Sequence, residues 1–334
     1  MLDNPLLLEE NEPMNRDQQY TMVLRREVLP AVGCTEPIAV ALACASAVKA
    51  LGVSWDALDS IRLLLSRNVI KNALGVGIPG TGMAGIQIAA ALGCTGGNPE
   101  GSLEVIAFCS EKELEAAKEL ARRNIITVSR FEGTEKLYIE TLITAQDRKA
   151  RVVIQRDHRF ITLIEVDGKV IRQQQLPDEQ EESRQLQTQS LADVFDFAMT
   201  VPLDELDFIL QGARMNMKVA QEGLIGDYGL RVGKSIKRNI DRKLLSDSLM
   251  TYAVELSSAA ADARMAGCTL PVMTNSGSGN QGITVSLPVL AVAEKIGADE
   301  TMLHRALILS NLAAIHARKG LGRLTALCGA ITAA

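Results

Sequence analysis

The pattern of apolar, charged and β-branched residues changes near residue 98 and again near residue 175, and this change constrains the fold more than any other feature. Between these points a charged amphipathic helix pattern at 111–123 is followed by four short runs rich in β-branched residues, separated by turn residues. On both sides the apolar segments are rich in small residues and have helix patterns. We therefore predict an α+β fold, a helix-rich domain that carries an inserted small α+β domain.

The same change of residue pattern sets the expected domain boundaries. Residues 1–97 are expected to form the first part of the helical domain, and 191–334 the second part, because helices separated by an insert can share one core. The insert spans 98–175, and the polar, acidic stretch 176–190 is expected to be a linker. Aromatic residues make up only 3% of the chain, so the core must consist mainly of aliphatic side chains and alanine.

Charge and hydropathy exclude several classes of protein. The chain has 35 Lys and Arg against 40 Asp and Glu, a net charge of −5, and the absence of a basic block argues against a nucleic-acid partner. The N-terminal stretch MLDNPLLLEENEP is too acidic and too poor in apolar residues for a signal peptide. No apolar segment has the pattern of a membrane span. We expect a cytoplasmic protein without a membrane partner.

The six cysteines and three histidines show no metal-binding spacing. There is no C-x-x-C pair and no H-E-x-x-H motif. Cys44 and Cys109 stand in apolar runs and are expected to be reduced core residues, while Cys94 and Cys268 are expected at helix ends with structural roles.

Two glycine-rich loops are candidates for a binding site. The loops GVGIPGTGMAG (75–85) and NSGSGNQG (275–282) each contain G-x-G-x-x-G, which is a weak dinucleotide signal here because Pro79 interrupts the first and no strand precedes the second. Each loop runs into an apolar helix, whose first N–H groups can bind an anion. Tight turns are the alternative interpretation. Together the loops are expected to hold a small amino acid, with side-chain donors from Thr81, Ser276, Ser278 and Asn280.

Cys34 stands directly before a helix that is expected to begin at Thr35 or Glu36. The positive end of a helix favours the thiolate form of a cysteine, whereas the neighbouring Glu36 opposes it. Two interpretations remain open for Cys34. It is either a reactive thiol beside the glycine loops or a buried cysteine at the entry of a helix.

Several long motifs in one order resemble the L-cysteine desulfidase family, which is related to the alpha chain of iron–sulfur L-serine dehydratases. The motifs are EVLPAVGCTEPIAVALA, KNALGVGIPGTGMAG, AQEGLIGDYGLRVG, AAADARMAG, LPVMTNSGSGNQGI and LTALCGA. The resemblance runs from about residue 20 to the end of the chain. It implies that the helix-rich domain is catalytic and that the substrate is a small L-amino acid. We also expect the protein to be a homo-oligomer.

The resemblance also implies a cofactor and a set of site residues. The family uses a 4Fe–4S cluster held by three cysteines, and an open iron acts on the leaving group of L-cysteine, which yields sulfide, pyruvate and ammonia. By position in the motifs, Cys34 is the expected proton-transfer group and Cys328 the first cluster ligand. The expected substrate-binding residues are Glu36, Lys71, Asn72, Thr81, Ser276, Ser278, Gly279 and Asn280.

The end of the chain departs from the family pattern. The two other cluster cysteines of the family lie further on, whereas this chain ends six residues after Cys328. We therefore expect the cluster to be incomplete or absent in this chain, and the chain to lack desulfidase activity by itself. Three alternatives stay open: an iron–sulfur L-serine dehydratase, a pyridoxal-phosphate lyase with Lys71 as the Schiff base, and an inactive truncated scaffold or amino-acid-binding protein.

Overall fold

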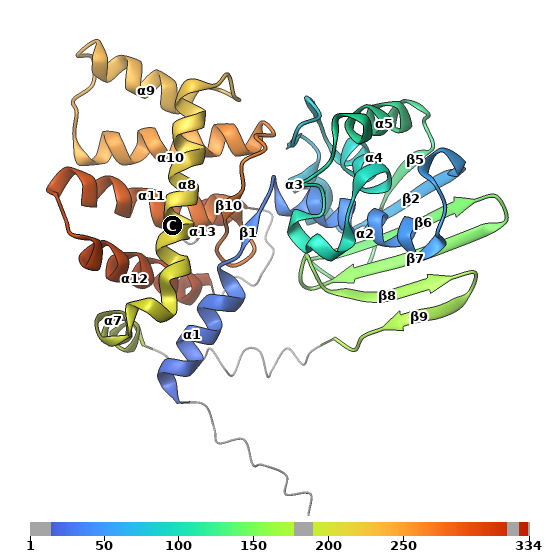
Figure 1. The fold of residues 1–334 in the computed structure, drawn as a ribbon, viewed down its shortest axis with the longest axis horizontal. Helices are drawn as coiled ribbons and strands as arrows, with labels where there is room; N and C mark the ends of the chain where they lie inside the picture. Colours follow the sequence, from blue (N-terminus) through green and yellow to red (C-terminus); the bar gives the residue numbers. More distant parts are fainter. Residues whose placement is uncertain (1–14, 177–189, 319–326, 333–334) are drawn as a thin grey trace, which may run out of the picture.

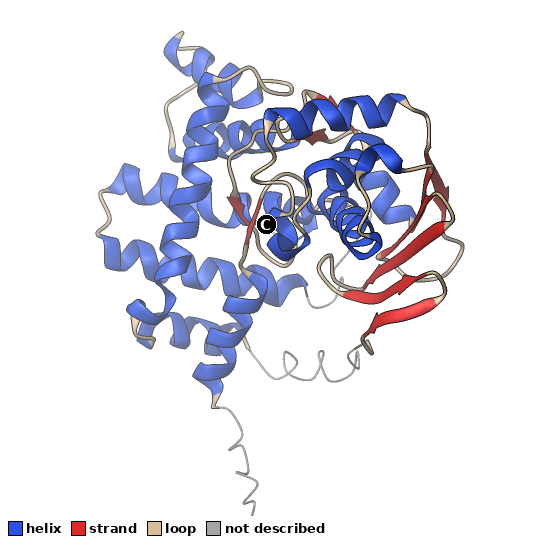
Figure 2. Ribbon diagram, turned by 45° about the vertical axis from the view of Figure 1, so that its right-hand side comes forward, coloured by secondary structure: helices blue, strands red, loops and turns tan. Residues whose placement is uncertain are grey.

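The computed structural model describes residues 15–176, 190–318 and 327–332, which form two lobes (Figure 1). We call residues 32–176 the sheet lobe, and residues 15–31, 190–318 and 327–332 the helical lobe. Figure 2 shows the main sheet confined to one side of the molecule and most helices on the other. The α+β class predicted from the sequence is confirmed.

A six-stranded sheet forms one side of the sheet lobe, with the strand order β5-β2-β6-β7-β8-β9. The pair β2 and β5 is parallel, and the other neighbours are antiparallel. Along β6, Ile139, Thr141 and Ile143 are buried at alternate positions, as the period of a strand requires. The strands are β2 (Ser60–Leu65), β5 (Ile126–Arg130), β6 (Tyr138–Ala145), β7 (Arg148–Gln155), β8 (Ile161–Val166) and β9 (Lys169–Gln173).

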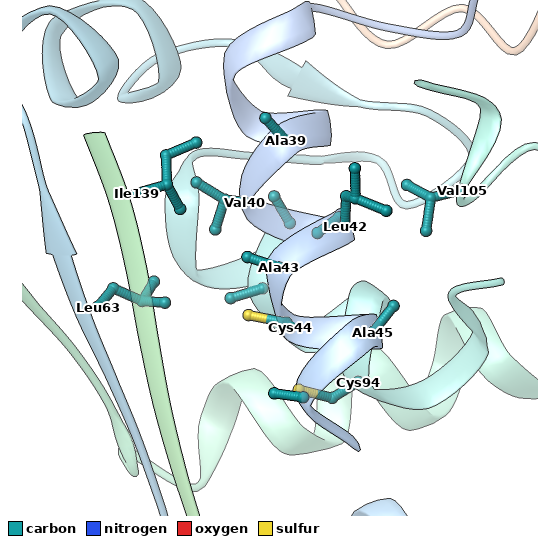
Figure 3. Close-up of a cluster of buried hydrophobic side chains, with 14 of the residues drawn as sticks. Ala39, Val40, Leu42, Ala43, Cys44, Ala45, Leu63, Cys94, Val105 and Ile139 are labelled. Carbon is teal, nitrogen blue, oxygen red and sulfur yellow. The ribbon is translucent and has the colours of Figure 1, made fainter. Parts of the chain in front are cut away.

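Helix α2 is the centre of the sheet lobe. It packs on β6, β7 and α4, and Figure 3 shows its small side chains between the sheet residues Leu63 and Ile139 and Cys94 of α4. A Cβ at Gly93 would lie 2.3 Å from the carbonyl oxygen of Ala41, so the two helix backbones are in direct contact. The remaining bounds are α2 (Thr35–Leu51), α3 (Arg67–Ala73), α4 (Ile86–Gly96), α5 (Glu111–Arg122), the 3₁₀ helices η1 (Trp55–Ala57) and η2 (Pro99–Glu104), β3 (Gly77–Ile78) and β4 (Met83–Ala84).

The helical lobe has its own core, in which α8 packs on α10 and α10 packs on α11. A Cβ at Gly223 would lie 2.0 Å from the carbonyl oxygen of Ala259, which again shows close helix packing through a glycine. Strand β1 (Pro30–Ala31) pairs with β10 (Val272–Met273). The helices are α1 (Arg16–Glu27), α7 (Leu191–Thr200), η3 (Leu203–Leu206), α8 (Asp207–Ile225), α9 (Val232–Asp241), α10 (Leu249–Met265), α11 (Gly279–Ile296), α12 (Glu300–Arg318) and α13 (Gly329–Thr332).

The domain boundary expected at residue 97 is wrong. Strand β2 lies inside the sheet between β5 and β6, and α2 and α4 belong to the same core as the strands of the insert. The physical reason is that the apolar face of a sheet must be covered, and α5 alone cannot cover six strands. Of the helices that precede residue 97, α2, α3 and α4 therefore share the core of the insert, whereas α1 joins the core of the helical lobe.

Two further segments lie near the ends of the insert. The run LEVIAF at 103–108 has a strand-like pattern, but it forms the end of η2 and a turn, with Leu103, Val105 and Ile106 buried in the sheet-lobe core. Of the expected linker at 176–190, residues 177–189 lie outside the described residues. Within the ranges that the structure describes, no helix combines the length and the apolar character needed to cross a bilayer.

Candidate functional site

A pocket of about 270 Å³ lies between the two lobes. The sheet lobe contributes the start of α2, the end of α3 and the turn between β7 and β8. The helical lobe contributes the ends of α10 and α12 and the starts of α11 and α13. Seven residues expected from the sequence line this pocket: Cys34, Glu36, Lys71, Asn72, Ser278, Asn280 and Cys328. This volume lies just below the usual range of ligand sites, roughly 300–1,000 Å³, and so suits a small molecule.

Cys34 and Glu36 form a hydrogen-bonded pair at the start of α2. Cys34 is the N-cap residue of the helix, and its thiol donates to Oε2 of Glu36 over 3.1 Å. The hydroxyl of Thr35 donates to the carbonyl oxygen of Gly277 over 3.0 Å, which ties the start of α2 to the second glycine loop. All three side chains are buried. The thiol is therefore held beside a carboxylate and close to the opposite lobe.

The protonation of this pair follows from its surroundings. Burial raises the pKa of the Cys34 thiol to about 12; the charge of Glu36 adds to the rise, and Arg264 opposes it. Burial by itself would raise the pKa of Glu36, but the charge of His158 and the hydrogen bonds from Cys34 and Asn72 outweigh it, so this pKa lies below its ordinary value. At neutral pH the pair thus consists of a thiol and a carboxylate. The positive end of α2 does not make Cys34 a thiolate here.

Two further residues position Glu36. The side-chain amide of Asn72 donates to its Oε1 over 3.0 Å, and Nε2 of His158 lies 3.9 Å from the same oxygen. His158 is buried and comes from the turn between β7 and β8, within the insert, whereas the resemblance places the site in the helix-rich domain. That expectation needs correction, because the inserted strands bring His158 to the pocket.

The second glycine loop is held by a network of buried amides. Asn275 Nδ2 donates to Oδ1 of Asn311 over 2.9 Å, and Gln281 Nε2 donates to Oδ1 of Asn275 over 2.8 Å. Arg318 in turn donates from Nη1 to Oε1 of Gln281. These contacts fix the backbone that presents Ser278 and Asn280 to the pocket.

Three of the expected substrate-binding residues do not line the pocket. The hydroxyl of Thr81 donates to the carbonyl oxygen of Ile78 over 2.8 Å, because residues 77–84 form the β3–β4 hairpin rather than a binding loop. Ser276 is buried and donates to Oδ1 of Asn275 over 3.0 Å. Gly279 lies behind the guanidinium of Arg264 instead of facing the pocket. Local donors are consumed by the turns themselves, as the alternative interpretation of the loops predicts.

Three basic pocket residues were missed from the sequence: His158, Arg264 and Arg318. Arg264 stands in the motif AAADARMAG, which was recognised as part of the resemblance but was not given a role. An arginine near the C-terminal end of a predicted helix usually interacts with the helix end and solvent. Only the burial of Arg264, with 3% of its surface exposed, distinguishes it from that ordinary case.

Cys328, the cluster ligand expected from the resemblance, lines the pocket. Cys328 fits a ligand, because its half-buried sulfur lies in the pocket and Nδ2 of Asn280 points to it over 3.7 Å. All six cysteines lie within the described residues, but only Cys34 and Cys328 line this pocket. No group of three or more possible metal ligands occurs among the described residues. The residues present therefore do not fit a complete cluster site, and no chemical step is derived from one.

The high pKa of Cys34 predicts a slow reaction with alkylating reagents. With a pKa of about 12, roughly 10⁻⁴ of the thiol is ionised at pH 8, against about a quarter for a free cysteine, so alkylation should be about 10³-fold slower. The rate should rise toward pH 12. Glu36→Gln removes a negative charge and should speed the reaction about tenfold, the effect of one pKa unit. Iodoacetamide labelling followed by peptide mass spectrometry measures both rates.

Glu255→Gln is the matched control for this measurement, because Glu255 is also buried but does not line the pocket. Equal labelling rates of Cys34 in the parent and in Glu36→Gln would show that the carboxylate does not control the thiol.

Comparisons with known proteins give one family. A family model described as serine dehydratase alpha chain matches residues 100–334. A UPF0597 protein of Oleidesulfovibrio alaskensis is 44% identical over 317 residues, which cover 95% of this chain and 73% of that protein. UPF0597 proteins of Bacteroides thetaiotaomicron and Aeromonas salmonicida are each 46% identical, over 95% and 94% of this chain and 73% and 72% of their own lengths. No solved structure gave a significant match.

Proposed function

The chain belongs to the serine dehydratase alpha chain family, and from this premise we propose that the pocket eliminates the β-substituent of a small L-amino acid. L-Cysteine is the proposed substrate. The Cα–H bond breaks, its electron pair forms the Cα=Cβ bond, and the Cβ–S bond breaks with release of sulfide. The resulting aminoacrylate takes up water and becomes pyruvate and ammonia.

The observation that carries this proposal is the pair of Cys34 and Glu36 at the start of α2. A β-elimination needs a group that takes a proton from Cα and a group that can return one to the leaving atom. The pair contains an acid and a base 3.1 Å apart in a buried pocket: the Cys34 thiol and the Glu36 carboxylate. Cys34 is the proposed proton-transfer group: its thiol gives its proton to Glu36, the resulting thiolate takes the proton from Cα, and Glu36 returns a proton to the leaving sulfur.

The other lining residues are proposed to bind and orient the substrate. Asn72 and His158 keep the carboxylate of Glu36 in place. Ser278 and Asn280, at the start of α11, offer polar groups from the opposite lobe, and Lys71 adds a cation from α3. A substrate between the two lobes would contact both, so that a small shift of either lobe changes its orientation.

Elimination of water from L-serine is the second candidate. The same geometry serves both substrates, since they differ in one atom at the leaving group, and the description of the matching family favours serine. The test is to purify the protein encoded by the natural gene without oxygen and to measure pyruvate from each amino acid. Formation of pyruvate together with sulfide supports the cysteine reaction. Absence of pyruvate from both substrates would refute the proposal.

A 4Fe–4S cluster, where the family has one, would supply a Lewis acid at the leaving group. Because only two of the six cysteines reach the pocket, we expect that the 334-residue chain treated with iron and sulfide forms no stable cluster and releases no sulfide from L-cysteine. Visible absorbance after gel filtration measures this. A brown protein that keeps its iron would contradict the expectation.

A further inference from the structure

Arg264 is a buried cation with two unused donors. It stands near the end of α10 with 3% of its surface exposed, and it lines the pocket. Neither Nε nor Nη2 has a hydrogen-bond partner among the described residues. A buried guanidinium without an anion is costly, because it loses its hydration and gains no partner. An anionic ligand that entered the pocket would pair with this guanidinium and remove that cost.

The remaining contacts of Arg264 hold it in one orientation. Its Nη1 donates to Oδ1 of Asn280 over 2.9 Å. Gly279 leaves the space that the guanidinium occupies, since a Cβ at this position would lie 2.3 Å from Nε. The unused atoms Nε and Nη2 form one edge of the planar guanidinium, which is the edge that matches the two oxygens of a carboxylate.

The helices around the pocket reinforce the preference for an anion. Residues at the starts of α2 and α11 both line it, and the positive end of a helix favours negative charge. Glu36 is the carboxylate among the lining residues, and it is already hydrogen-bonded to Cys34 and Asn72. Among the described residues, neither Nε nor Nη2 of Arg264 donates a hydrogen bond to Glu36, so this edge of the guanidinium is not paired with the carboxylate.

We propose that Arg264 binds the α-carboxylate of the amino-acid substrate through Nε and Nη2. This inference rests on the proposed function in taking an amino acid as the ligand. Glu36, on the sheet-lobe side of the same pocket, faces the α-ammonium group. The pocket thus selects a zwitterion: a carboxylate at Arg264 and an ammonium at Glu36. An amino-acid amide, which lacks the negative charge, leaves the guanidinium unpaired and is rejected.

The test is binding of L-alanine, which has no β leaving group and is not consumed. Calorimetry on the 334-residue chain should show binding of L-alanine and at least about tenfold weaker binding of L-alaninamide. Arg264→Gln should weaken L-alanine binding about 10- to 100-fold, and Arg264→Lys should weaken it less. The matched control is Arg214→Gln, an exposed arginine of α8 paired with Glu300, which should bind L-alanine like the parent.

Several outcomes would overturn the proposal. They are equal binding of L-alanine and L-alaninamide, undetectable binding of L-alanine, and parental affinity in Arg264→Gln. If Arg264→Gln does not fold, as judged by circular dichroism, Gly279→Ala serves instead, because its Cβ displaces the guanidinium and should lower affinity by a similar factor. The two proposals fail separately. In the protein encoded by the natural gene, L-alanine bound through Arg264 without pyruvate from L-cysteine or L-serine refutes the lyase alone, and pyruvate formation with an unchanged KM in Arg264→Gln refutes the carboxylate site alone.

Discussion

Cys34→Ala is expected to slow the elimination about 10²–10⁴-fold in the protein encoded by the natural gene, the usual contribution of a positioned acid–base group. The reason is that Cys34 is the thiol hydrogen-bonded to Glu36 in the pocket, so its loss leaves the carboxylate without the group that exchanges its proton. Pyruvate release from L-cysteine and L-serine measures the rate. Cys328→Ala should fail differently, because it removes a proposed cluster ligand and with it the visible absorbance.

The matched control is Cys109→Ala, which removes a half-buried thiol that donates to the carbonyl oxygen of Gly96 and does not line the pocket. It should keep both the rate and the absorbance. A Cys34→Ala protein that retains its absorbance and turns over substrate at the parental rate would remove Cys34 from the mechanism.

Phe197→Ala is expected to lower the free energy of unfolding by about 3–5 kcal/mol, the range for truncating a buried phenylalanine. Phe197 of α7 is 0% exposed and packs on Tyr20 of α1, with ring centroids 4.9 Å apart. Removal of the Phe197 ring leaves a cavity in the helical lobe. It also weakens the packing of α1, which belongs to the core of the helical lobe and not to that of the sheet lobe. Urea unfolding followed by circular dichroism measures the loss.

Phe108→Ala is the control for that substitution, since Phe108 is 93% exposed and should change stability by no more than about 0.5 kcal/mol. A loss as large as that of Phe197→Ala would mean that Phe108 is buried in the folded protein. A small loss for Phe197→Ala would place α1 outside the core of the helical lobe.

Local sequence patterns alone determined most of the elements. The all-apolar run after Thr35 predicts a buried helix, and α2 extends from Thr35 to Leu51. Four β-branched runs predict strands that the structure contains as β5 to β8, and the charged pattern at 111–123 predicts α5. These predictions succeed because helix and strand periodicity and capping depend on residues only a few positions apart. The position of Cys34 directly before a helix follows from the same local rules.

Tertiary structure decided which elements share a core and which side chains meet. Strand β2 pairs with β5 and β6, 65 to 84 residues further along the chain, and this pairing moves the domain boundary. Three separate segments of the chain contribute Cys34, His158 and Arg264 to the pocket. The protonation of Cys34 is largely a tertiary property, because burial is the largest cause of its raised pKa and depends on the packing of distant segments, whereas Glu36 stands two residues away in the sequence. Desolvation and contacts between distant segments have no local signature, so only the folded chain reveals them.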